Sequence, residues 1–317
     1  AQAPLGTAFD RRPEPHQILE GVDFGGRTAL VTGGYSGIGL ETTRALAAAG
    51  ARVVVPVRSP EKAEQALAEI PGDVGHGAMD LSDLASVRAF ARAFGEREPR
   101  LDLLIANAGV MACPETRVGP GWELQLATNH LGHFVLAAEL LPLLRRTAER
   151  SERVRVVALS SSGHRLSDIR WEDPHFHAEP YDKWLAYGQA KSANALFALE
   201  LDRLGEPLGV RSFAVHPGGI ATPLQRHLSM EEQIAMGWYD EDGRINEAFK
   251  SVEEGAATTV WCATSALLDG IGGVYCEDCN IALPADRGPR SAGGRRTPCF
   301  NRQRYVIGHG RSRFCDK

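Results

Sequence analysis

The chain has 317 residues, of which 43% are hydrophobic and 24% charged, and its formal net charge is −5 at pH 7. This size and composition suit one large folded α/β domain and are short for two independent ones. The sequence has no run of eighteen apolar residues, and its start lacks the basic-then-apolar order of a signal peptide, so we expect a cytoplasmic protein with no membrane partner.

A lead-in with prolines and charges, residues 1–24, comes first and is expected to lie as an arm on the surface. Residues 28–50 then predict a strand, a turn with four glycines, and an Ala- and Leu-rich helix. Glycines let the chain turn tightly and let a diphosphate approach the backbone N–H groups at the positive end of the helix. The spacing Thr-Gly-x-x-x-Gly-x-Gly at residues 32–39 therefore predicts a dinucleotide site, with an ordinary glycine-rich turn as the alternative.

The next predicted strand, residues 51–57, is apolar almost throughout and is followed directly by Arg58. In a dinucleotide fold the end of this strand meets the adenosine ribose, where an acidic residue accepts hydrogen bonds from free hydroxyls and a cation accommodates a 2′-phosphate. Val57 and Arg58 offer no acid, so the sequence favours NADP over NAD as the cofactor. The alternative is that Arg58 is simply solvated in a loop.

Strands and helices continue to alternate beyond Arg58. We expect helices at residues 60–69 and 84–94, and strands at residues 76–79 and 101–106. Asp80 and Ser82 are suited to cap the second helix, and the second strand opens into Asn107, Ala108 and Gly109. This alternation predicts an α/β fold, a Rossmann-like doubly wound parallel sheet flanked by helices in a single domain, with the ligand at the carboxyl ends of the strands.

A long helical region, residues 122–150, comes next, with Asn129 early in it and a kink expected near Pro142. By itself Asn129 signifies little, since a lone helical Asn is usually a surface or satisfied buried group. A fifth apolar strand, residues 154–159, ends in three serines at residues 160–162.

Three parts of the sequence lack a clear period. Residues 163–183 carry three His without metal-ligand spacing, so a substrate-facing or packing loop is the better interpretation. Residues 225–251, with Met and aromatic groups, are either a mobile lid over an apolar pocket or ordinary surface helices. Cys276 and Cys279 form a single Cys-x-x-Cys without a second pair, so we expect packing thiols and no metal; the six scattered Cys suit a reducing compartment.

Tyr187 and Lys191 lie four residues apart in a segment with helical apolar spacing and therefore share one helix face. A phenol has a pKa near 10, which is too high for ready proton exchange at neutral pH. A nearby ammonium stabilises the phenolate and lowers that pKa, so the pair predicts a Tyr that acts as a general acid or base.

These motifs together resemble the short-chain dehydrogenase/reductase family. Their order and approximate spacing match over residues 25–282: the glycine turn of residues 32–39, Asp80, the triplet of residues 107–109, Asn129, Ser161, Tyr187, Lys191 and Pro217-Gly218. The long gap between the serine and the tyrosine, and the runs HPGGIATPL and GGVYCEDCNIA, are similar to the retinol-dehydrogenase-like and protochlorophyllide-reductase-like branch.

The resemblance implies a role for each catalytic residue. Tyr187 would transfer a proton to or from the substrate oxygen, and Lys191 would bind the nicotinamide ribose and lower the pKa of the Tyr187 phenol. Ser161 would hydrogen-bond the substrate carbonyl, with Ser160 and Ser162 as alternatives if the register slips. Asn129 would support a water chain behind Lys191.

The resemblance also implies contacts with the cofactor along its whole length. The expected cofactor-binding residues, besides Tyr187 and Lys191, are Gly33, Ser36, Gly37, Ile38 and Gly39 at the phosphates, Arg58 at the 2′-phosphate, Asp80 and Leu81 at the adenine, Asn107, Ala108 and Gly109 at the adenosine side, and Pro217, Gly218, Ile220 and Thr222 at the nicotinamide carboxamide. The cofactor would exchange a hydride with the substrate while the protein positions both.

The end of the chain departs from this pattern. Residues 283–317 carry nine Lys and Arg against two Asp and Glu and have almost no apolar periodicity, so we expect a basic, poorly ordered tail. It lacks the interleaved aromatic residues and the fold of a nucleic-acid-binding segment, so we expect no nucleic-acid partner.

The function predicted from the sequence is hydride transfer between NADP(H) and a fairly bulky, apolar ketone, aldehyde or secondary alcohol. Two alternatives stay open: a ketoreductase acting on a polyketide-type secondary metabolite, and a non-catalytic Rossmann protein that senses NADP. A sensor has no need of Ser161, Tyr187, Lys191 and Asn129 together, which speaks against the second alternative. Assembly into a homo-oligomer is also left open.

Overall fold

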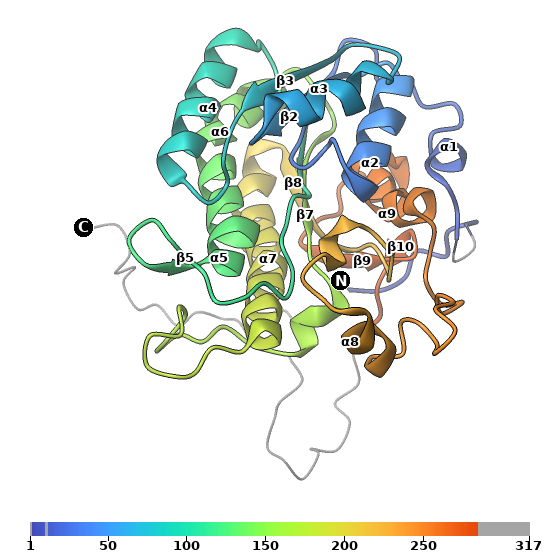
Figure 1. Ribbon diagram of the computed structural model, residues 1–317. Coiled ribbons are helices and arrows are strands. Elements are labelled where there is room, and N and C mark those ends of the chain that lie inside the picture. The colour runs from blue at the N-terminus through green and yellow to red at the C-terminus, as the bar shows by residue number, and fades with distance from the viewer. Residues whose placement is uncertain (1, 10–11, 285–317) are drawn as a thin grey trace.

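The computed structural model describes residues 2–9 and 12–284, and within them the chain forms one central sheet covered by helices on both faces (Figure 1). The eight strands run in the order β10-β9-β8-β7-β4-β1-β2-β3, and all neighbours are parallel except β10, which pairs antiparallel with β9. The strand order changes direction between β1 and β4, and a crevice at such a point is where open α/β sheets bind ligands. The predicted Rossmann-like parallel sheet is therefore confirmed.

The strands are short and mostly buried. They are β1 (Thr28–Val31), β2 (Arg52–Val57), β3 (Val74–Ala78), β4 (Leu103–Ala106), β7 (Val154–Leu159), β8 (Val210–His216), β9 (Val274–Glu277) and β10 (Asn280–Ile281), with β5 (Arg117–Val118) and β6 (Trp122–Glu123) forming a separate hairpin.

Helices connect the strands. They are α1 (Pro15–Ile18), α2 (Gly37–Ala48), α3 (Pro60–Ala68), α4 (Leu84–Arg97), α5 (Leu124–Leu126), α6 (Gly132–Ala148), α7 (Lys183–Gly205), α8 (Met230–Ala235) and α9 (Val252–Thr264), together with a π-helical turn, η1 (Ala127–Leu131), and the 3-10 turns η2 (Ser162–Arg165), η3 (Glu206–Leu208), η4 (Pro223–Gln225) and η5 (Ala266–Leu268).

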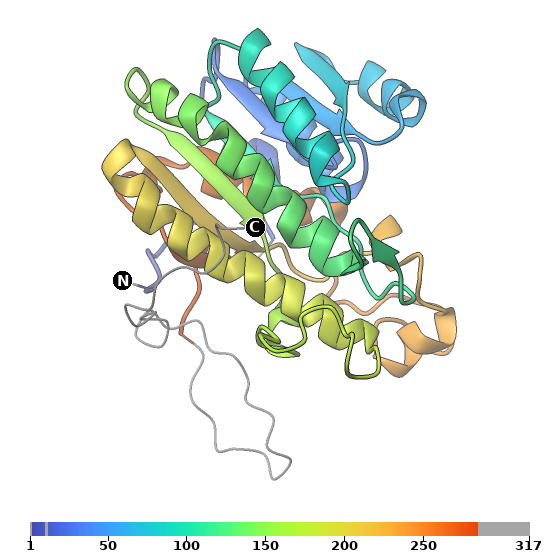
Figure 2. The ribbon, with the colours of Figure 1, turned by 90° about the vertical axis from the view of Figure 1, so that its left-hand side faces the viewer.

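The sheet is the middle of three layers. On one face α2, α3 and α9 bury an apolar cluster against the strands, and on the other α4, α6 and α7 bury a second one. Figure 2 looks onto the second face, where α4, α6 and α7 cross the strands obliquely. The strands β1, β4 and β7 are buried at every position. Because helices cover both of their faces, these strands are apolar almost throughout.

Three sequence-based expectations need correction. The helix expected over residues 122–150 is interrupted: β6 opens it, and η1 separates α5 from α6. The cap of α4 is Asp83, whose carboxylate accepts from the backbone N–H of Ala85 at 2.9 Å, and not Asp80 or Ser82. The strand expected at residues 76–79 begins two residues earlier and ends one residue earlier, as the edge strand β3, because its pairing with β2 sets its register.

The start of the chain differs from a simple surface arm. Ile18 and Phe24 of the lead-in are buried in the core cluster below α2 and α9, so this arm is only partly at the surface. Near the start, Gln2 bonds to the backbone of Tyr275 and Ala282 at the sheet edge. Of the predicted basic tail only Leu283 and Pro284 are described, and residues 285–317 lie outside the described part.

Candidate active site

The glycine turn between β1 and α2 is packed so tightly that side chains are excluded. Gly33 has a φ of +67°, which favours glycine, and a Cβ on Gly39 would lie 2.3 Å from the carbonyl oxygen of Gly33 and 2.4 Å from Nδ2 of Asn107. Gly37, with a φ of +52°, begins the 12-residue helix α2 after Ser36. The turn thus leaves bare backbone at the positive end of a long helix, as anion binding requires.

Thr32 joins this turn to the loop that follows β4. Its Oγ1 accepts hydrogen bonds from the backbone N–H groups of Asn107 and Ala108 at 2.9 and 3.0 Å, and its carbonyl accepts from Nδ2 of Asn107 at 2.8 Å. The carboxyl ends of β1 and β4 are therefore held together where the strand order changes direction. Asn107, Ala108 and Gly109 were predicted to contact the adenosine side of the cofactor, which stays a prediction; the structure places Asn107 and Ala108 against the glycine turn.

The residues expected at the adenosine lie at the ends of β2 and β3. Arg58 is exposed directly after β2, whereas Leu81 is buried. Oδ1 of Asp80 accepts from the backbone N–H and the hydroxyl of Ser82 at 2.8 and 2.7 Å, so this oxygen holds a turn of its own chain. Arg58 is the solvent-facing cation of this set.

The loop after β8 also packs close to the glycine turn and the start of α2. Thr222 lies 3.4 Å from the position that a Cβ of Gly37 would take, and the side chains of Ile38 and Ile220 both lie within 3 Å of the position that a Cβ of Gly255 would take. Gly218, with a φ of +106°, takes a conformation that favours glycine. The residues predicted for the phosphates and for the carboxamide therefore lie close to one another.

Tyr187 and Lys191 project from α7 and are both about 5% exposed. The Lys191 Nζ lies 5.6 Å from the centre of the Tyr187 ring and donates a hydrogen bond of 3.0 Å to the carbonyl oxygen of Leu159, the last residue of β7. Spacing of four residues on one helix thus places both groups at the end of the strand that carries the serines.

The three serines after β7 have three different partners. Ser161 hydrogen-bonds to the Tyr187 phenol, and its Oγ also accepts from the backbone N–H of Gly163 at 3.1 Å. The Ser160 hydroxyl instead donates to the backbone carbonyl of Lys191 at 2.8 Å, and the backbone N–H of Ser162 donates to Nδ1 of His216 at 3.3 Å. Of the three, the structure pairs Ser161 with the tyrosine.

The electrostatics of this pair differ from the sequence-based expectation. Burial raises the pKa of Tyr187 to about 12, and the hydrogen bond with Ser161 only partly opposes it. Burial also lowers the pKa of Lys191 to about 8. The four-residue spacing predicted a lowered phenol pKa, but in the fold desolvation of the phenolate is the dominant influence and raises that pKa.

Asn129 lies in the π-turn η1 and is fully buried. Its amide makes two reciprocal bonds with the backbone of Val110, accepting from the N–H at 2.8 Å and donating to the carbonyl at 2.9 Å. A Cβ on Gly109 would lie 3.1 Å from Oδ1 of Asn129 and 3.9 Å from Nζ of Lys191. The Asn129 amide therefore holds the loop after β4 beside Lys191, and the water chain stays a prediction.

Apolar side chains pack around the Tyr187 ring. Met111, Ala112 and Leu228 pack with it in one buried cluster, to which Trp184, Leu224 and Trp238 also belong at the border. The two tryptophan rings meet edge-on at 6.2 Å. The segment of residues 225–251, for which a lid and ordinary surface helices were both left open, thus contributes Trp238 to this cluster, whereas its residues Met230 and Met236 are exposed.

Two residues at the site escaped the sequence reasoning. A Cβ on Gly163 would lie 2.8 Å from the Tyr187 ring, so a glycine directly after the serines is what lets the ring approach Ser161. His133, buried one helical turn after Asn129, contacts both Asn129 and Thr32. The i, i+4 spacing from Asn129 was the available signal for His133, and a Gly following the serines was the signal for Gly163.

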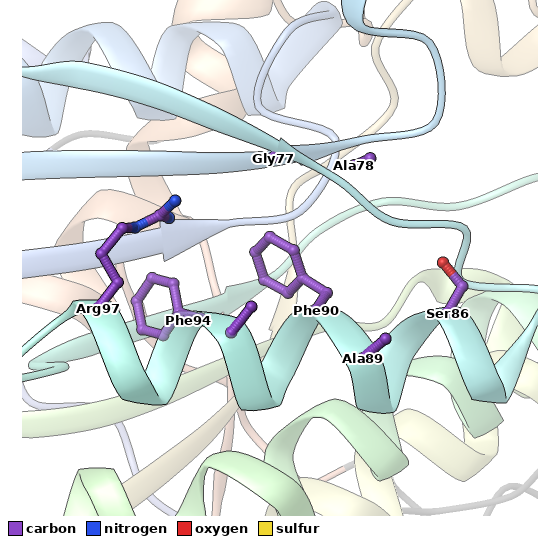
Figure 3. Close-up of a pocket in the computed structure, with 8 residues that line it drawn as sticks. Gly77, Ala78, Ser86, Ala89, Phe90, Phe94 and Arg97 are labelled. Carbon is purple, nitrogen blue, oxygen red and sulfur yellow. The ribbon is translucent and has the colours of Figure 1, made fainter.

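A separate hollow of about 340 Å³ lies between β3 and α4 at the edge of the sheet (Figure 3). Its apolar floor includes Phe90 and Phe94, whose ring centres are 6.0 Å apart, and Arg97 lies at one end. None of the predicted site residues lines it, and its polar groups, Ser86 and Arg97, form no acid–base pair. The candidate active site is therefore the cluster at the ends of β1, β4 and β7.

The remaining predicted features are thiols and membrane segments. Cys276 and Cys279 are free, buried and part of the apolar core cluster. Among residues 2–9 and 12–284, no three His, Cys, Asp or Glu side chains are grouped so that they could hold a metal ion. Within the same residues, none of the helices combines the length and apolar character needed to cross a bilayer.

The parallel sheet and its glycine turn place the protein in the Rossmann-like α/β class. Residues 27–173 match the family model of the short chain dehydrogenases. A probable oxidoreductase of Streptomyces lividans is 46% identical over 280 residues, which cover 86% of this chain and 92% of that protein. The chain therefore belongs to the short-chain dehydrogenase/reductase family.

One further relative indicates the branch of the family, and one solved structure has a similar fold. Retinol dehydrogenase 11 of Mus musculus is 38% identical over 284 residues, covering 87% of this chain and 85% of that protein. The solved structure of the RhlG/NADP active-site complex of Pseudomonas aeruginosa is 29% identical with a TM-score of 0.63, covering 80% of this chain and 95% of that one. The predicted resemblance to the retinol-dehydrogenase-like branch is confirmed.

Proposed function

We propose that the protein is an NADP(H)-dependent carbonyl reductase or alcohol dehydrogenase that acts on a fairly bulky, apolar ketone, aldehyde or secondary alcohol. The observation that carries this proposal is the buried cluster at the end of β7, where Ser161 bonds to the Tyr187 phenol and Lys191 lies one helical turn on. A protein that only senses a nucleotide needs no buried proton donor beside its cofactor site.

The residues around the glycine turn fit a dinucleotide. Gly33 and Gly39 allow the turn to pack directly against Asn107 and Ala108, and Gly37 begins a helix whose N–H groups suit a diphosphate. Arg58, exposed after β2, would hold a 2′-phosphate, and the NADP named for the Pseudomonas aeruginosa relative supports this choice. When bound, NADPH supplies a hydride to the substrate carbon.

The chain's own groups then handle the proton. Since burial raises the pKa of Tyr187 to about 12, the phenol is protonated at neutral pH and can donate its proton to the carbonyl oxygen as a general acid. With substrate bound, Ser161 would exchange its bond with that phenol for one that it donates to the same carbonyl oxygen, and would so fix the position of that oxygen. The Lys191 ammonium, held by the carbonyl of Leu159, would supply positive potential and hydrogen bonds to the ribose.

The expected substrate class follows from the surroundings of Tyr187. Met111, Leu228 and the Trp184–Trp238 pair place apolar and aromatic side chains next to the Tyr187 ring. A bulky apolar carbonyl compound would bury this surface, whereas a small polar one would not.

The proposal is tested by following NADPH consumption with the purified protein across a panel of ketones and aldehydes of increasing apolar size. We expect turnover that rises with apolar bulk. Tight NADPH binding without turnover of any carbonyl in the panel would refute the enzyme and favour the sensor. Turnover confined to polyketide-type ketones would select the ketoreductase alternative.

Replacing the exposed cation after β2 should change the choice of cofactor. Arg58→Ser removes a charge-assisted contact with the 2′-phosphate, which is worth about 1.5–3 kcal/mol. We therefore expect KM for NADPH to rise about 10–100-fold and KM for NADH to stay unchanged. The matched control is Arg92→Ser, because Arg92 is also an exposed arginine but lies on α4. An unchanged preference for NADPH over NADH in Arg58→Ser would remove Arg58 from the cofactor site.

The reduction should lose activity in mildly alkaline solution. Lys191 has a pKa lowered to about 8, so its ammonium is present at pH 6–7 and is lost as the pH rises through about 8. Tyr187, with a pKa of about 12, stays protonated over this range and cannot cause the loss. We expect kcat/KM for carbonyl reduction to be level below about pH 7 and to fall above about pH 8, because the pH dependence of kcat/KM reports the pKa values of essential groups in the free enzyme. In Lys191→Arg the remaining activity should be level across the same range, and a sloping profile there would exclude Lys191 as the titrating group.

A further inference from the structure

His133 lies at the start of α6 and is 2% exposed. Its Nδ1 is 2.9 Å from the backbone carbonyl oxygen of Asn129, and its Nε2 is 2.8 Å from Oγ1 of Thr32. The ring therefore bridges the π-turn η1, which carries Asn129, and the glycine turn, which follows Thr32. No other described side chain contacts both of these groups through hydrogen bonds.

The partners of His133 fix the position of its proton. A carbonyl oxygen can only accept, so Nδ1 must carry the proton that it shares with Asn129. At the other nitrogen, Oγ1 of Thr32 already accepts from the backbone N–H groups of Asn107 and Ala108, which occupies both of its lone pairs. The Thr32 hydroxyl must therefore donate, and Nε2 of His133 at 2.8 Å is a nearer acceptor than the Ile105 carbonyl at 3.3 Å.

Both arguments give the same tautomer, and burial supports it. The cost of burying a charge lowers the pKa of His133 to about 4, so the ring is neutral at physiological pH. A second proton on Nε2 would point at an oxygen with no free lone pair. The two other basic groups that act on this ring are Lys191 and His130, and both disfavour a charge on it.

We propose that His133 is a positioning residue, which in its Nδ1–H form joins the cofactor turn to the catalytic cluster by holding Thr32 on one side and Asn129 on the other. Thr32 fixes Asn107 and Ala108 through its hydroxyl, and Asn129 fixes Val110 through its amide. The loop of residues 107–110 is thus clamped at both ends by groups that His133 connects. This proposal rests on the proposed function for its kinetic consequences.

His133 makes two hydrogen bonds, one with Thr32 (the Thr32 arm) and one with Asn129 (the Asn129 arm), and we expect different effects when each is lost. The Thr32 arm supports the loop at the glycine turn, so its loss should weaken NADPH binding. The Asn129 arm supports Gly109 and Asn129 beside Lys191, so its loss should slow the chemical step. Misplacement of about 1 Å in such a site costs on the order of 100-fold in rate.

Three substitutions separate the arms. His133→Asn places an amide near the position of Nδ1 and keeps the donor to Asn129, so we expect kcat within about threefold of the parent and KM for NADPH raised about tenfold. His133→Gln reaches the position of Nε2 and keeps a partner for Thr32, so we expect the reverse, an almost unchanged KM for NADPH and kcat lowered about 10–100-fold. His133→Leu should show both losses. His16→Leu, at an exposed His of the lead-in, is the control.

These outcomes decide between positioning and mere packing. If the three variants lose thermal stability but keep the parent values of kcat and KM, His133 only fills the core and the proposal is overturned. It is equally overturned if His133→Asn and His133→Gln change kcat and KM in the same way. A reciprocal split between the two variants supports it.

A readout without turnover keeps this test separate from that of the proposed function. In the protein labelled with ¹⁵N at histidine, we expect His133 to show a protonated Nδ1 and an unprotonated Nε2, unchanged between pH 6 and 8. Direct titration with NADPH should give weaker binding for His133→Asn than for His133→Gln. A protonated Nε2, or equal affinities, would overturn the bridge even if the parent protein reduced no carbonyl at all.

Discussion

Tyr187→Phe is expected to lower kcat for carbonyl reduction by about 10²–10⁴-fold, the contribution typical of a positioned general acid. Phenylalanine keeps the ring that packs beside Gly163 and among Met111, Ala112 and Leu228, but it has no proton to give and no partner for Ser161. Because the ring and its packing remain, we expect NADPH affinity within about threefold of the parent and a similar melting temperature. Single-turnover kinetics with saturating NADPH measure the step directly.

Tyr181→Phe is the matched control for this result. The Tyr181 hydroxyl bonds to Gln125 at 2.9 Å and to the carbonyl of Cys113 at 3.1 Å, away from Ser161 and Lys191. Its removal should cost about 1 kcal/mol of stability and leave kcat unchanged. If Tyr187→Phe retained a rate close to that of the parent, the proton would have to come from another group, and the proposed mechanism would be wrong.

The parts of the fold that were predictable from the sequence are those determined by local pattern. The strand at residues 154–159 was placed at its observed bounds, because a run buried on both faces is apolar at nearly every position, here all but Arg155, and because it ends before the first serine. The alternation of strands and helices also gave the parallel sheet, and the glycine spacing gave the turn at which β1 meets the loop after β4.

The parts that were not predictable depend on contacts between distant segments. The apolar period runs on through residues 122–150, so the π-turn at Asn129 has no local signal, and the bonds of Asn129 to Val110 and to His133 become visible only in the fold. Asp80, Ser82 and Asp83 are all able to cap a helix, and only the bond from Ala85 selects Asp83.

The site itself shows the same division. Spacing on one helix correctly brought Tyr187 and Lys191 together, but it gave the wrong direction for the phenol pKa, since burial is a property of the whole fold. Of the three adjacent serines the sequence favoured Ser161, and the contacts with Tyr187 and with the Lys191 carbonyl distinguish it from Ser160.

Gly39→Ala is expected to destroy the cofactor site. The new Cβ would lie 2.3 Å from the carbonyl oxygen of Gly33 and 2.4 Å from Nδ2 of Asn107, and the first of these clashes is with backbone that cannot rotate away. Asn107 must then give up its bond to the Thr32 carbonyl, and the N–H groups at the start of α2 lose their direction. Because the diphosphate would then forgo two or more charge-assisted hydrogen bonds, we expect the Kd for NADPH to rise about 100–1,000-fold.

Gly95→Ala on α4 is the control that separates this crowding from a general effect of replacing glycine. A Cβ there meets nothing within 4 Å, so the substitution should stabilise the protein by about 1 kcal/mol and leave NADPH binding unchanged. For Gly39→Ala we expect a loss of stability of about 1–3 kcal/mol beside the loss of affinity, measured by thermal melting and by titration of NADPH fluorescence. Retention of the parent affinity in Gly39→Ala would mean that the dinucleotide does not lie against this turn. The proposed positions of Ser161, Tyr187 and Lys191 relative to the hydride donor would then lose their support, because those positions assume a cofactor bound at the glycine turn between β1 and α2.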